Sequence, residues 1–277
     1  MDNIKVLAGI ITYNPNINRL IENVEAIIDQ CNECVICDNG SGNITDIIDA
    51  FKEERRVNFI RNKENKGIAK AINQIMAYAD ELKYEWFLTL DQDSVCMPRL
   101  IETYLKFVSP EVGQITCNIV DRNIGALSKH KDDLECLECE GCITSGALNN
   151  TKAMKKIGGY EPLFINGVDL DISCRLREKG FKILHVHFPG LLHELGEGKK
   201  HDILGHEIIT SNHNPLRNYY ARRNLIYLAR RHYIGKKKIT KIVRQIIYGV
   251  GIIILEDKKI LRMKYNLRGI IDGFRMK

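Results

Sequence analysis

Residues 4–28 read IKVLAGIITYNPNINRLIENVEAII, and the hydrophobic pattern of this stretch changes its period midway. Residues 4–12 form an apolar run of strand length, which ends at the turn residues Tyr13-Asn14-Pro15-Asn16. From residue 17 to residue 28, apolar side chains recur at the spacing of one helix face. The stretch therefore predicts a β-strand, a polar loop and an α-helix in succession.

The same alternation continues outward from this unit. Because strands joined by helical crossovers form parallel sheets with helices on both faces, the pattern predicts an α/β fold with a mostly parallel, doubly wound sheet. Further strands are expected at residues 34–37, 57–60 and 86–90, and helices at residues 44–51 and 67–79.

After residue 100 the pattern loosens, and beyond Pro215 the chain is helical with mixed basic and apolar residues. We therefore predict one domain over residues 1–215 and a basic helical region over residues 216–277. In the looser part, strands are expected at residues 113–119, 143–148 and 181–187, a helix at 169–179 and an acidic loop at 132–140.

Composition places the chain among ordinary globular proteins. Of its 277 residues, 44% are hydrophobic and 27% are charged, which excludes a disordered or low-complexity chain. The net charge of +6 conceals an asymmetry, because residues 217–277 hold 17 Lys and Arg against 3 Asp and Glu. A basic region on an acidic body favours a polyanionic partner, either nucleic acid or an anionic membrane, although a solvated helix face would look alike.

The amino-terminal residues show no basic segment followed by an apolar core and a cleavage site, so we expect a cytoplasmic protein. The most apolar later stretch, residues 246–255, is about half as long as the roughly twenty residues that a spanning helix needs. It can lie on a membrane but not cross one. The basic residues interleaved with apolar ones from residue 237 to 250 predict an amphipathic helix at an anionic bilayer. Packing on the body or on a second subunit is the alternative.

Nine cysteines include two Cys-x2-Cys-x2-Cys runs. Such spacing suits zinc or iron–sulfur ligation, whereas the apolar neighbours of several of these cysteines are typical of small core residues. Both interpretations stay open. The two runs are Cys31, Cys34, Cys37 and Cys136, Cys139, Cys142.

Four polar loops follow the first four predicted strands. Because ligands of such sheets bind at the carboxyl ends of the strands, these loops should carry the chemistry. Asp91 and Asp93 lie two apart after the fourth strand, so both carboxylates can face one Mg²⁺ or Mn²⁺ that also binds a diphosphate. Asp38, after the second strand, can accept a hydrogen bond from the imide of a pyrimidine base. A simple turn is the alternative for both loops.

Asp169 and Asp171 open the helix predicted at residues 169–179. Charge at a helix N-terminus explains one of them, and the second is typical of a general base. His193 follows a buried-looking strand and is a candidate third ligand of the cation, unless it is a structural histidine. Dinucleotide-binding, P-loop and nucleophile-elbow signatures are absent from the sequence.

Taken in order, these motifs resemble family 2 glycosyltransferases of the GT-A fold over about residues 4–200. The segment over residues 215–224 looks like the tail of the bacterial rhamnosyltransferase branch, which uses dTDP-L-rhamnose. The motifs are Thr12-Tyr13-Asn14, Asp38-Asn39-Gly40-Ser41, Asn65-Lys66-Gly67-Ile68-Ala69 with Asn73, Asp91-Gln92-Asp93, Gly146, Gly158-Gly159-Tyr160, Asp169-Leu170-Asp171 with Arg175, and His193.

The resemblance implies a role for each matching position. Asp169 would be the base, with Asp171 sharing the role, because Val168 stands where the family often has another acid. Asp93 and His193 would hold the cation. The donor nucleotide would lie against Thr12, Tyr13, Asn14, Asp38, Asn39, Asn65, Lys66, Gly67, Asp91 and Gln92.

The expected function is therefore inverting transfer of a sugar, L-rhamnose from dTDP-L-rhamnose, to a hydroxyl of a lipid-linked or polysaccharide acceptor at the inner face of the cell membrane. A UDP-hexose donor is one alternative. A sugar nucleotidylyltransferase is another, although it should carry a glycine-rich loop with Thr-Arg after the first strand. A nucleic-acid-binding module would explain the basic tail but not the four polar loops, so no nucleic-acid partner is expected. The oligomeric state stays open.

Overall fold

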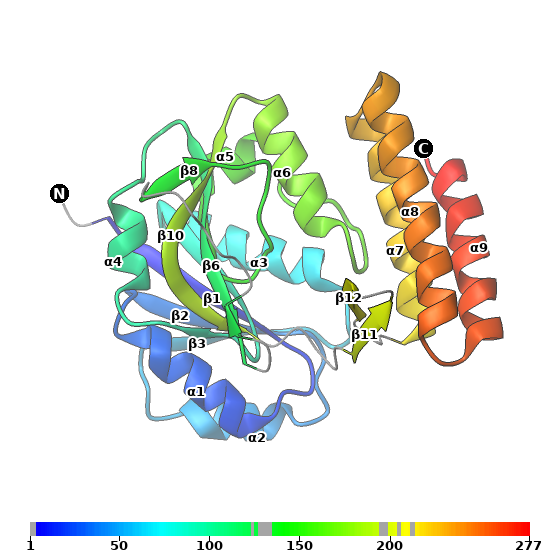
Figure 1. Ribbon diagram of the computed structural model, residues 1–277. Helices are drawn as coiled ribbons and strands as arrows, with labels where there is room; N and C mark the ends of the chain where they lie inside the picture. Colours follow the sequence, from blue (N-terminus) through cyan, green and yellow to red (C-terminus); the bar gives the residue numbers. More distant parts are fainter. Residues whose placement is uncertain (1–3, 123–124, 127–134, 194–198, 204–205, 211–213) are drawn as a thin grey trace. The chain divides into compact units, whose positions relative to one another are not determined.

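The computed structural model describes residues 4–122, 125–126, 135–193, 199–203, 206–210 and 214–277 (Figure 1). The chain forms two compact units. The sheet unit comprises Met1–Pro162 and Val168–Glu194, and the helical unit comprises Leu163–Gly167 and Leu195–Lys277.

Four parallel strands form the first half of the sheet, in the order β3-β2-β1-β4. This arrangement confirms the predicted fold class. Thr12 pairs with Asp38, and Ile11 pairs with Asp91, so three polar loops leave the sheet at one edge. The elements are β1 (Val6–Thr12), α1 (Ile17–Ile28), β2 (Glu33–Asp38), α2 (Ile44–Phe51), β3 (Val57–Arg61), α3 (Ile68–Glu81) and β4 (Trp86–Asp91).

The second half of the sheet mixes directions. Strand β9 runs antiparallel between β4 and β6, and β10 is parallel to β6 but antiparallel to β5 and β8. The elements are β5 (Val95–Cys96), α4 (Leu100–Leu105), β6 (Val112–Asp121), β7 (Gly125–Ala126), β8 (Cys136–Glu138), β9 (Ala147–Asn150), α5 (Thr151–Lys156), α6 (Val168–Glu178) and β10 (Lys182–His193).

Two predictions in this half need correction. The strand expected at residues 143–148 is displaced to β9, because Gly146 takes a φ of 77° and the chain turns there before it joins the sheet. The acidic loop expected at 132–140 contains β8, which pairs with β10 through backbone hydrogen bonds that its acidic side chains do not prevent. Residues 132–134 lie outside the described residues.

Successive side chains along a strand point to opposite faces of the sheet, and each face is covered by helices. On one face, Val6, Ala8 and Ile10 of β1 join a core with side chains from α1, α2 and α4. On the other face, a Cβ at Gly9 would lie 2.4 Å from Ile75 of α3, so that helix packs closely against the strand. The doubly wound arrangement follows from this division (Figure 1).

The helical unit contains three long helices and a two-stranded antiparallel sheet of β11 (Lys199–Ile203) and β12 (His206–Thr210). Helix α7 begins at Pro215, and the Asn214 side chain accepts a hydrogen bond from the backbone N–H of Leu216. Among the helices that the structure describes, none has both the length and the hydropathy to cross a bilayer. The helices are α7 (Pro215–His232), α8 (Gly235–Leu255) and α9 (Lys259–Arg275).

Candidate functional site

Asp38 organises the loop after β2. Its side chain is buried, and its Oδ1 accepts a hydrogen bond of 3.1 Å from the Thr12 hydroxyl. Its Oδ2 accepts from the backbone N–H groups of Gly40 and Ser41, at 3.1 and 3.0 Å. A carboxylate has about four acceptor positions, so these three bonds leave about one for a ligand.

Asn14 and Ser41 join the loops after β1 and β2. The backbone N–H of Asn14 donates to Ser41 Oγ, and the N–H of Gly42 donates to Asn14 Oδ1, both at 2.8 Å. Asn14 takes a φ of 48°, a left-handed conformation that asparagine tolerates better than most residues. Next to it, the N–H of Tyr13 donates to Gln92 Oε1 at 2.8 Å. Gln92 thereby ties the first loop to the fourth, while the Tyr13 ring stays exposed.

Two asparagines join the loop after β2 to the loop after β3. Asn39 Nδ2 donates to Asn65 Oδ1 at 3.0 Å, and Asn39 Oδ1 accepts from the backbone N–H of Lys66 at 3.0 Å. The N–H of Gly67 also donates to Asn65 Oδ1, and the φ of 80° at Gly67 starts helix α3. In this structure both asparagine amides shape the loop that presents Lys66, whose side chain is exposed.

The fourth loop is held by hydroxyl groups. Ser145 Oγ accepts from the backbone N–H of Asp91 at 3.0 Å and lies 2.8 Å from Ser94 Oγ. Ser94 Oγ in turn lies 2.8 Å from Nδ1 of His193. The pairing of β5 with β10 thus places His193 beside Ser94, one residue from Asp93.

Several residues of this edge were missed by the sequence reasoning. Asn23, on α1, is buried and donates through Nδ2 to the backbone carbonyl of Asp91 at 2.8 Å. Ser94 and Ser145 lie 51 residues apart in the chain. The only local signal was Gly146 beside Ser145, because a glycine at φ > 0 marks a turn but does not tell what the turn contacts.

A cation could use Asp93 and His193 together. The Nδ1 of His193 is bonded to Ser94, which leaves Nε2 for a metal, and metal-bound histidines usually have such a partner on the other nitrogen. In the described part of the chain, no three His, Cys, Asp or Glu side chains group as a complete metal site. Mg²⁺ is usually bound by one or two protein carboxylates, with phosphate oxygens and water as the other ligands.

The two aspartates at the start of α6 have different surroundings. Asp171 is fully buried and forms an ion pair with Arg175, whose guanidinium approaches Asp171 Oδ2 to 2.7 Å. Arg175 also donates to the backbone carbonyl of Ile157 at 2.8 Å. Asp169 is half-buried, and burial raises the pKa of its carboxyl above 3.8, partly offset by hydrogen bonds from backbone N–H groups. Of the two, Asp169 has the surroundings of a proton acceptor.

The loop that precedes α6 belongs to the helical unit. Asn224 of α7 is buried, and its Nδ2 donates to the backbone carbonyls of Ile165 and Asn166 at 2.8 and 2.9 Å. Asn166 and Gly167 both take positive φ, 64° and 83°. The Asn224 side chain of α7 thus holds the backbone of residues 165 and 166.

The geometry of β2 separates two cysteines of the first run, Cys34 and Cys37. Strand geometry places Cys34 in the core on one face of β2, while Cys37 lies 3.8 Å from Gln74 Oε1 of α3 on the other face. Burial raises the pKa of the Cys37 thiol to about 12. Two thiols on opposite faces of one strand cannot grip one ion, so Cys34 and Cys37 act as small core residues.

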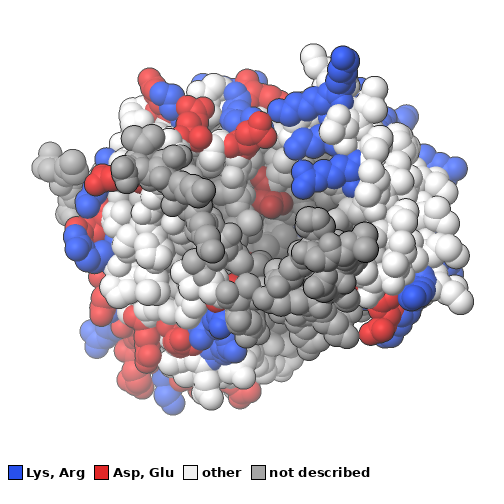
Figure 2. Space-filling model, in the orientation of Figure 1, with Lys and Arg blue, Asp and Glu red and all other residues white. Residues whose placement is uncertain are grey.

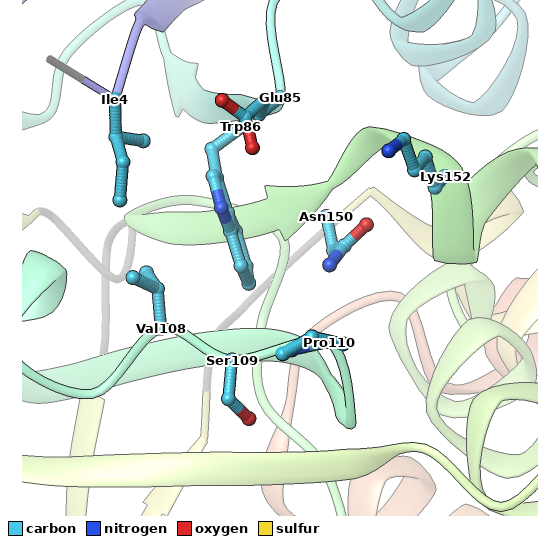
Figure 3. Close-up of a pocket in the computed structure, with 8 residues that line it drawn as sticks. All are labelled: Ile4, Glu85, Trp86, Val108, Ser109, Pro110, Asn150 and Lys152. Carbon is cyan, nitrogen blue, oxygen red and sulfur yellow. The ribbon is translucent and has the colours of Figure 1, made fainter. Parts of the chain in front are cut away.

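A hollow of about 240 Å³ lies at the other edge of the sheet (Figure 3). Trp86 begins β4 there, and Pro110 precedes β6, so this hollow opens at the amino ends of these strands. It is therefore separate from the polar loops. Its lining is Ile4, Glu85, Trp86, Val108, Ser109, Pro110, Asn150 and Lys152.

Comparisons with known proteins identify the family and the fold. The family model for Glycosyl transferase family 2 matches residues 8–167. The dTDP-rhamnosyl transferase RfbF of Shigella flexneri is 26% identical over 99% of this chain and 96% of its own length. The Staphylococcus aureus protein TarS, as residues 1–349, superposes with a TM-score of 0.66 at 12% identity, covering 97% of this chain and 80% of that one. GalNAc-T7, solved with UDP, GalNAc and Mn²⁺, has a TM-score of 0.64 at 13% identity, covering 99% of this chain and 56% of that one. These structures share the GT-A fold.

Proposed function

This chain belongs to glycosyl transferase family 2, and we propose that it transfers L-rhamnose from dTDP-L-rhamnose, with inversion, to an acceptor hydroxyl. The acceptor is a lipid-linked or polysaccharide glycan in cell-surface polysaccharide synthesis at the inner face of the membrane. One observation carries the choice of donor. The similarity to the dTDP-rhamnosyl transferase spans 99% of the chain and so includes the helical unit, beyond the residues 8–167 that define the family.

The base of the donor nucleotide would bind at the loops after β1 and β2. Asp38 keeps about one acceptor position after its three internal bonds, which suits the imide N–H of thymine or uracil. Thr12, Asn14, Asn39 and Asn65 would act through the loop shape that their hydrogen bonds maintain.

The diphosphate would bind near the fourth loop, with Asp91 toward the ribose. Asp93 and Nε2 of His193 would hold an Mg²⁺ or Mn²⁺ ion there. Such an ion supplies neutralisation of the charge that develops on the departing diphosphate. The chain's own part is to orient His193 through the Ser94 hydroxyl.

Asp169 would act as the base in a single displacement. Its carboxylate takes the proton of the acceptor hydroxyl as that oxygen attacks the anomeric carbon. The bond from this carbon to the diphosphate oxygen breaks, and the electron pair leaves with dTDP. Asp171 is unsuited to the role because its carboxylate is neutralised by Arg175.

A thermal-shift panel tests the donor. We expect dTDP to raise the melting temperature more than UDP, and only with Mg²⁺ or Mn²⁺, because a ligand of the native state stabilises it by mass action. Asp93→Ala should remove the metal-dependent part. Equal shifts in EDTA would exclude the metal role.

A product assay tests the reaction. We expect dTDP release from dTDP-L-rhamnose to depend on an added lipid-linked glycan. Preference for a UDP-hexose would replace the rhamnosyl proposal, and pyrophosphate release from a nucleoside triphosphate with a sugar phosphate would indicate a nucleotidylyltransferase.

A further inference from the structure

The buried faces of α8 and α9 are unusual for a water-soluble helical unit. Only one of their buried residues is large and apolar, whereas such helices normally turn their apolar stripe inward. The buried residues are Gly249 and Ile252 on α8, and Arg262, Asn266, Gly269 and Gly273 on α9.

Small residues bring α9 close to α7. A Cβ at Gly269 would lie 2.5 Å from the carbonyl oxygen of Tyr219, and one at Gly273 would lie 2.7 Å from that of Arg223. The two glycines are four residues apart, so they form one strip along α9. Closely approaching backbones at glycines in this spacing are typical of helices packed within lipid.

Polar contacts complete this interior. Arg222 of α7 is buried, donates to the backbone carbonyl of Gln245 at 2.6 Å and lies 5.0 Å from the centre of the Tyr248 ring. Arg262 forms a buried ion pair of 2.7 Å with Glu256. Helices α8 and α9 thus bury mainly glycines and polar side chains, and most of their large apolar side chains stay exposed.

The outward side of α8 and α9, called the apolar face, carries large hydrophobic side chains at spacings of three and four residues. Each is more than a third exposed, so none is fully covered by another part of the described chain. The apolar face comprises Ile239, Val243, Ile246, Ile247, Val250 and Ile254 on α8, and Ile260, Met263, Leu267, Ile271 and Phe274 on α9.

Positive charge borders this face. Residues 234–277 hold 12 Lys and Arg against 3 Asp and Glu. One of these acids, Glu256, is buried in an ion pair with Arg262. Figure 2 shows Lys and Arg gathered at the end of the helical unit where α8 begins, with uncharged surface along its length. A second copy of the chain is a poor partner, because two-fold pairing would bring two basic borders together.

We propose that the apolar face lies in the headgroup–acyl boundary of an anionic bilayer, with the basic residues of α8 and α9 on the lipid phosphates. Apolar burial and attraction to anionic lipid act together in such interfacial helices. This assignment does not depend on the donor or acceptor sugar, so it can fail or succeed separately from the proposed function.

Flotation of the whole chain with phosphatidylcholine vesicles, with and without phosphatidylglycerol, tests the proposal. We expect binding to the anionic vesicles that weakens in high salt and is much weaker on pure phosphatidylcholine. Ile247→Glu and Ile271→Glu, which lie on the exposed side of each helix, should each weaken binding about tenfold or more. Leu82→Glu is the matched control, because Leu82 is about as exposed as Ile271 but lies in the sheet unit.

A second pair of variants tests how much the basic residues of α8 contribute to vesicle binding. Lys236→Gln and Arg244→Gln, both exposed on α8, should each weaken binding about fivefold, the effect of one basic residue at such a surface. Lys52→Gln and Lys106→Gln in the sheet unit should change nothing. Circular dichroism and gel filtration check that each variant remains folded.

The results distinguish a bilayer from a second copy of the chain as the partner of the apolar face. Unchanged flotation of the folded Ile247→Glu and Ile271→Glu variants would overturn the proposal, as would equal binding to both kinds of vesicle. A wild-type dimer in light scattering that either variant converts to a monomer would identify the face as an interface between copies, and the proposal would then be wrong.

Discussion

Helix α1 of the sheet unit turns Leu20, Val24 and Ile27 into the core, whereas α9 of the helical unit turns Asn266, Gly269 and Gly273 inward and leaves its isoleucines outside. Both helices are amphipathic. In the sheet unit the apolar stripe finds its partner within the chain, while in the helical unit it stays on the surface. An amphipathic sequence therefore shows that a helix has an apolar face. Only the packing shows whether that face is buried in the core or exposed at the surface.

The largest expected effect concerns Asp169, which belongs to the sheet unit. Asp169→Asn should lower transfer by about two to four orders of magnitude, the usual contribution of a general base, and leave the thermal shift with dTDP unchanged. Steady-state kinetics and the shift assay measure the two effects. Normal turnover in this variant would move the base elsewhere.

Asp171 should behave in the opposite way, although it lies only two residues on. Asp171→Asn leaves Arg175 buried without its carboxylate, so we expect the free energy of unfolding to fall by about 3–5 kcal/mol. Denaturant titration of the whole chain, compared between wild type and variant, measures this loss. A stable variant without transfer activity would instead make Asp171 the base.

The buried stripe of α1 and the exposed stripe of α9 can be compared by truncating one apolar side chain in each helix. Leu20→Ala should lower the free energy of unfolding by about 2–5 kcal/mol because it leaves a cavity in the core. Ile271→Ala, with the side chain 49% exposed, should change it in water by less than about 0.5 kcal/mol. Comparable losses would show that the apolar face is covered in solution.

The smallest expected effect is a shift in the pH dependence of kcat/KM. Because burial raises the pKa of Asp169 above 3.8, kcat/KM should fall on the acid side at a higher pH than an ordinary aspartate would give. The sign for stability is opposite: the raised pKa favours the protonated form in the folded state, so this contribution to stability is present at low pH and is lost as pH rises through the folded pKa. An acid limb at the ordinary aspartate value would contradict the assignment.

Much of the sheet unit could be predicted from sequence because its signals are local. The period change at Tyr13 to Asn16 and the three repeats after it depend on neighbouring residues only, and they located β1 to β4 and the helices between them. The insertion of β9 between β4 and β6 could not be predicted, since strand pairing joins residues far apart in the chain. The contact of Ser94 with His193, 99 residues away, depends on that pairing.

The sequence by itself determined which residue types stand at the strand ends, where the chain becomes basic, and that residues 239–250 have an apolar stripe. Only the tertiary structure decided which of the two aspartates, Asp169 or Asp171, is neutralised, because the Arg175 side chain must fold back onto Asp171 to do so. It also decided that Gly269 and Gly273 rather than the isoleucines face α7. Periodicity defines a helix face relative to its own axis, whereas burial depends on what approaches that axis from outside.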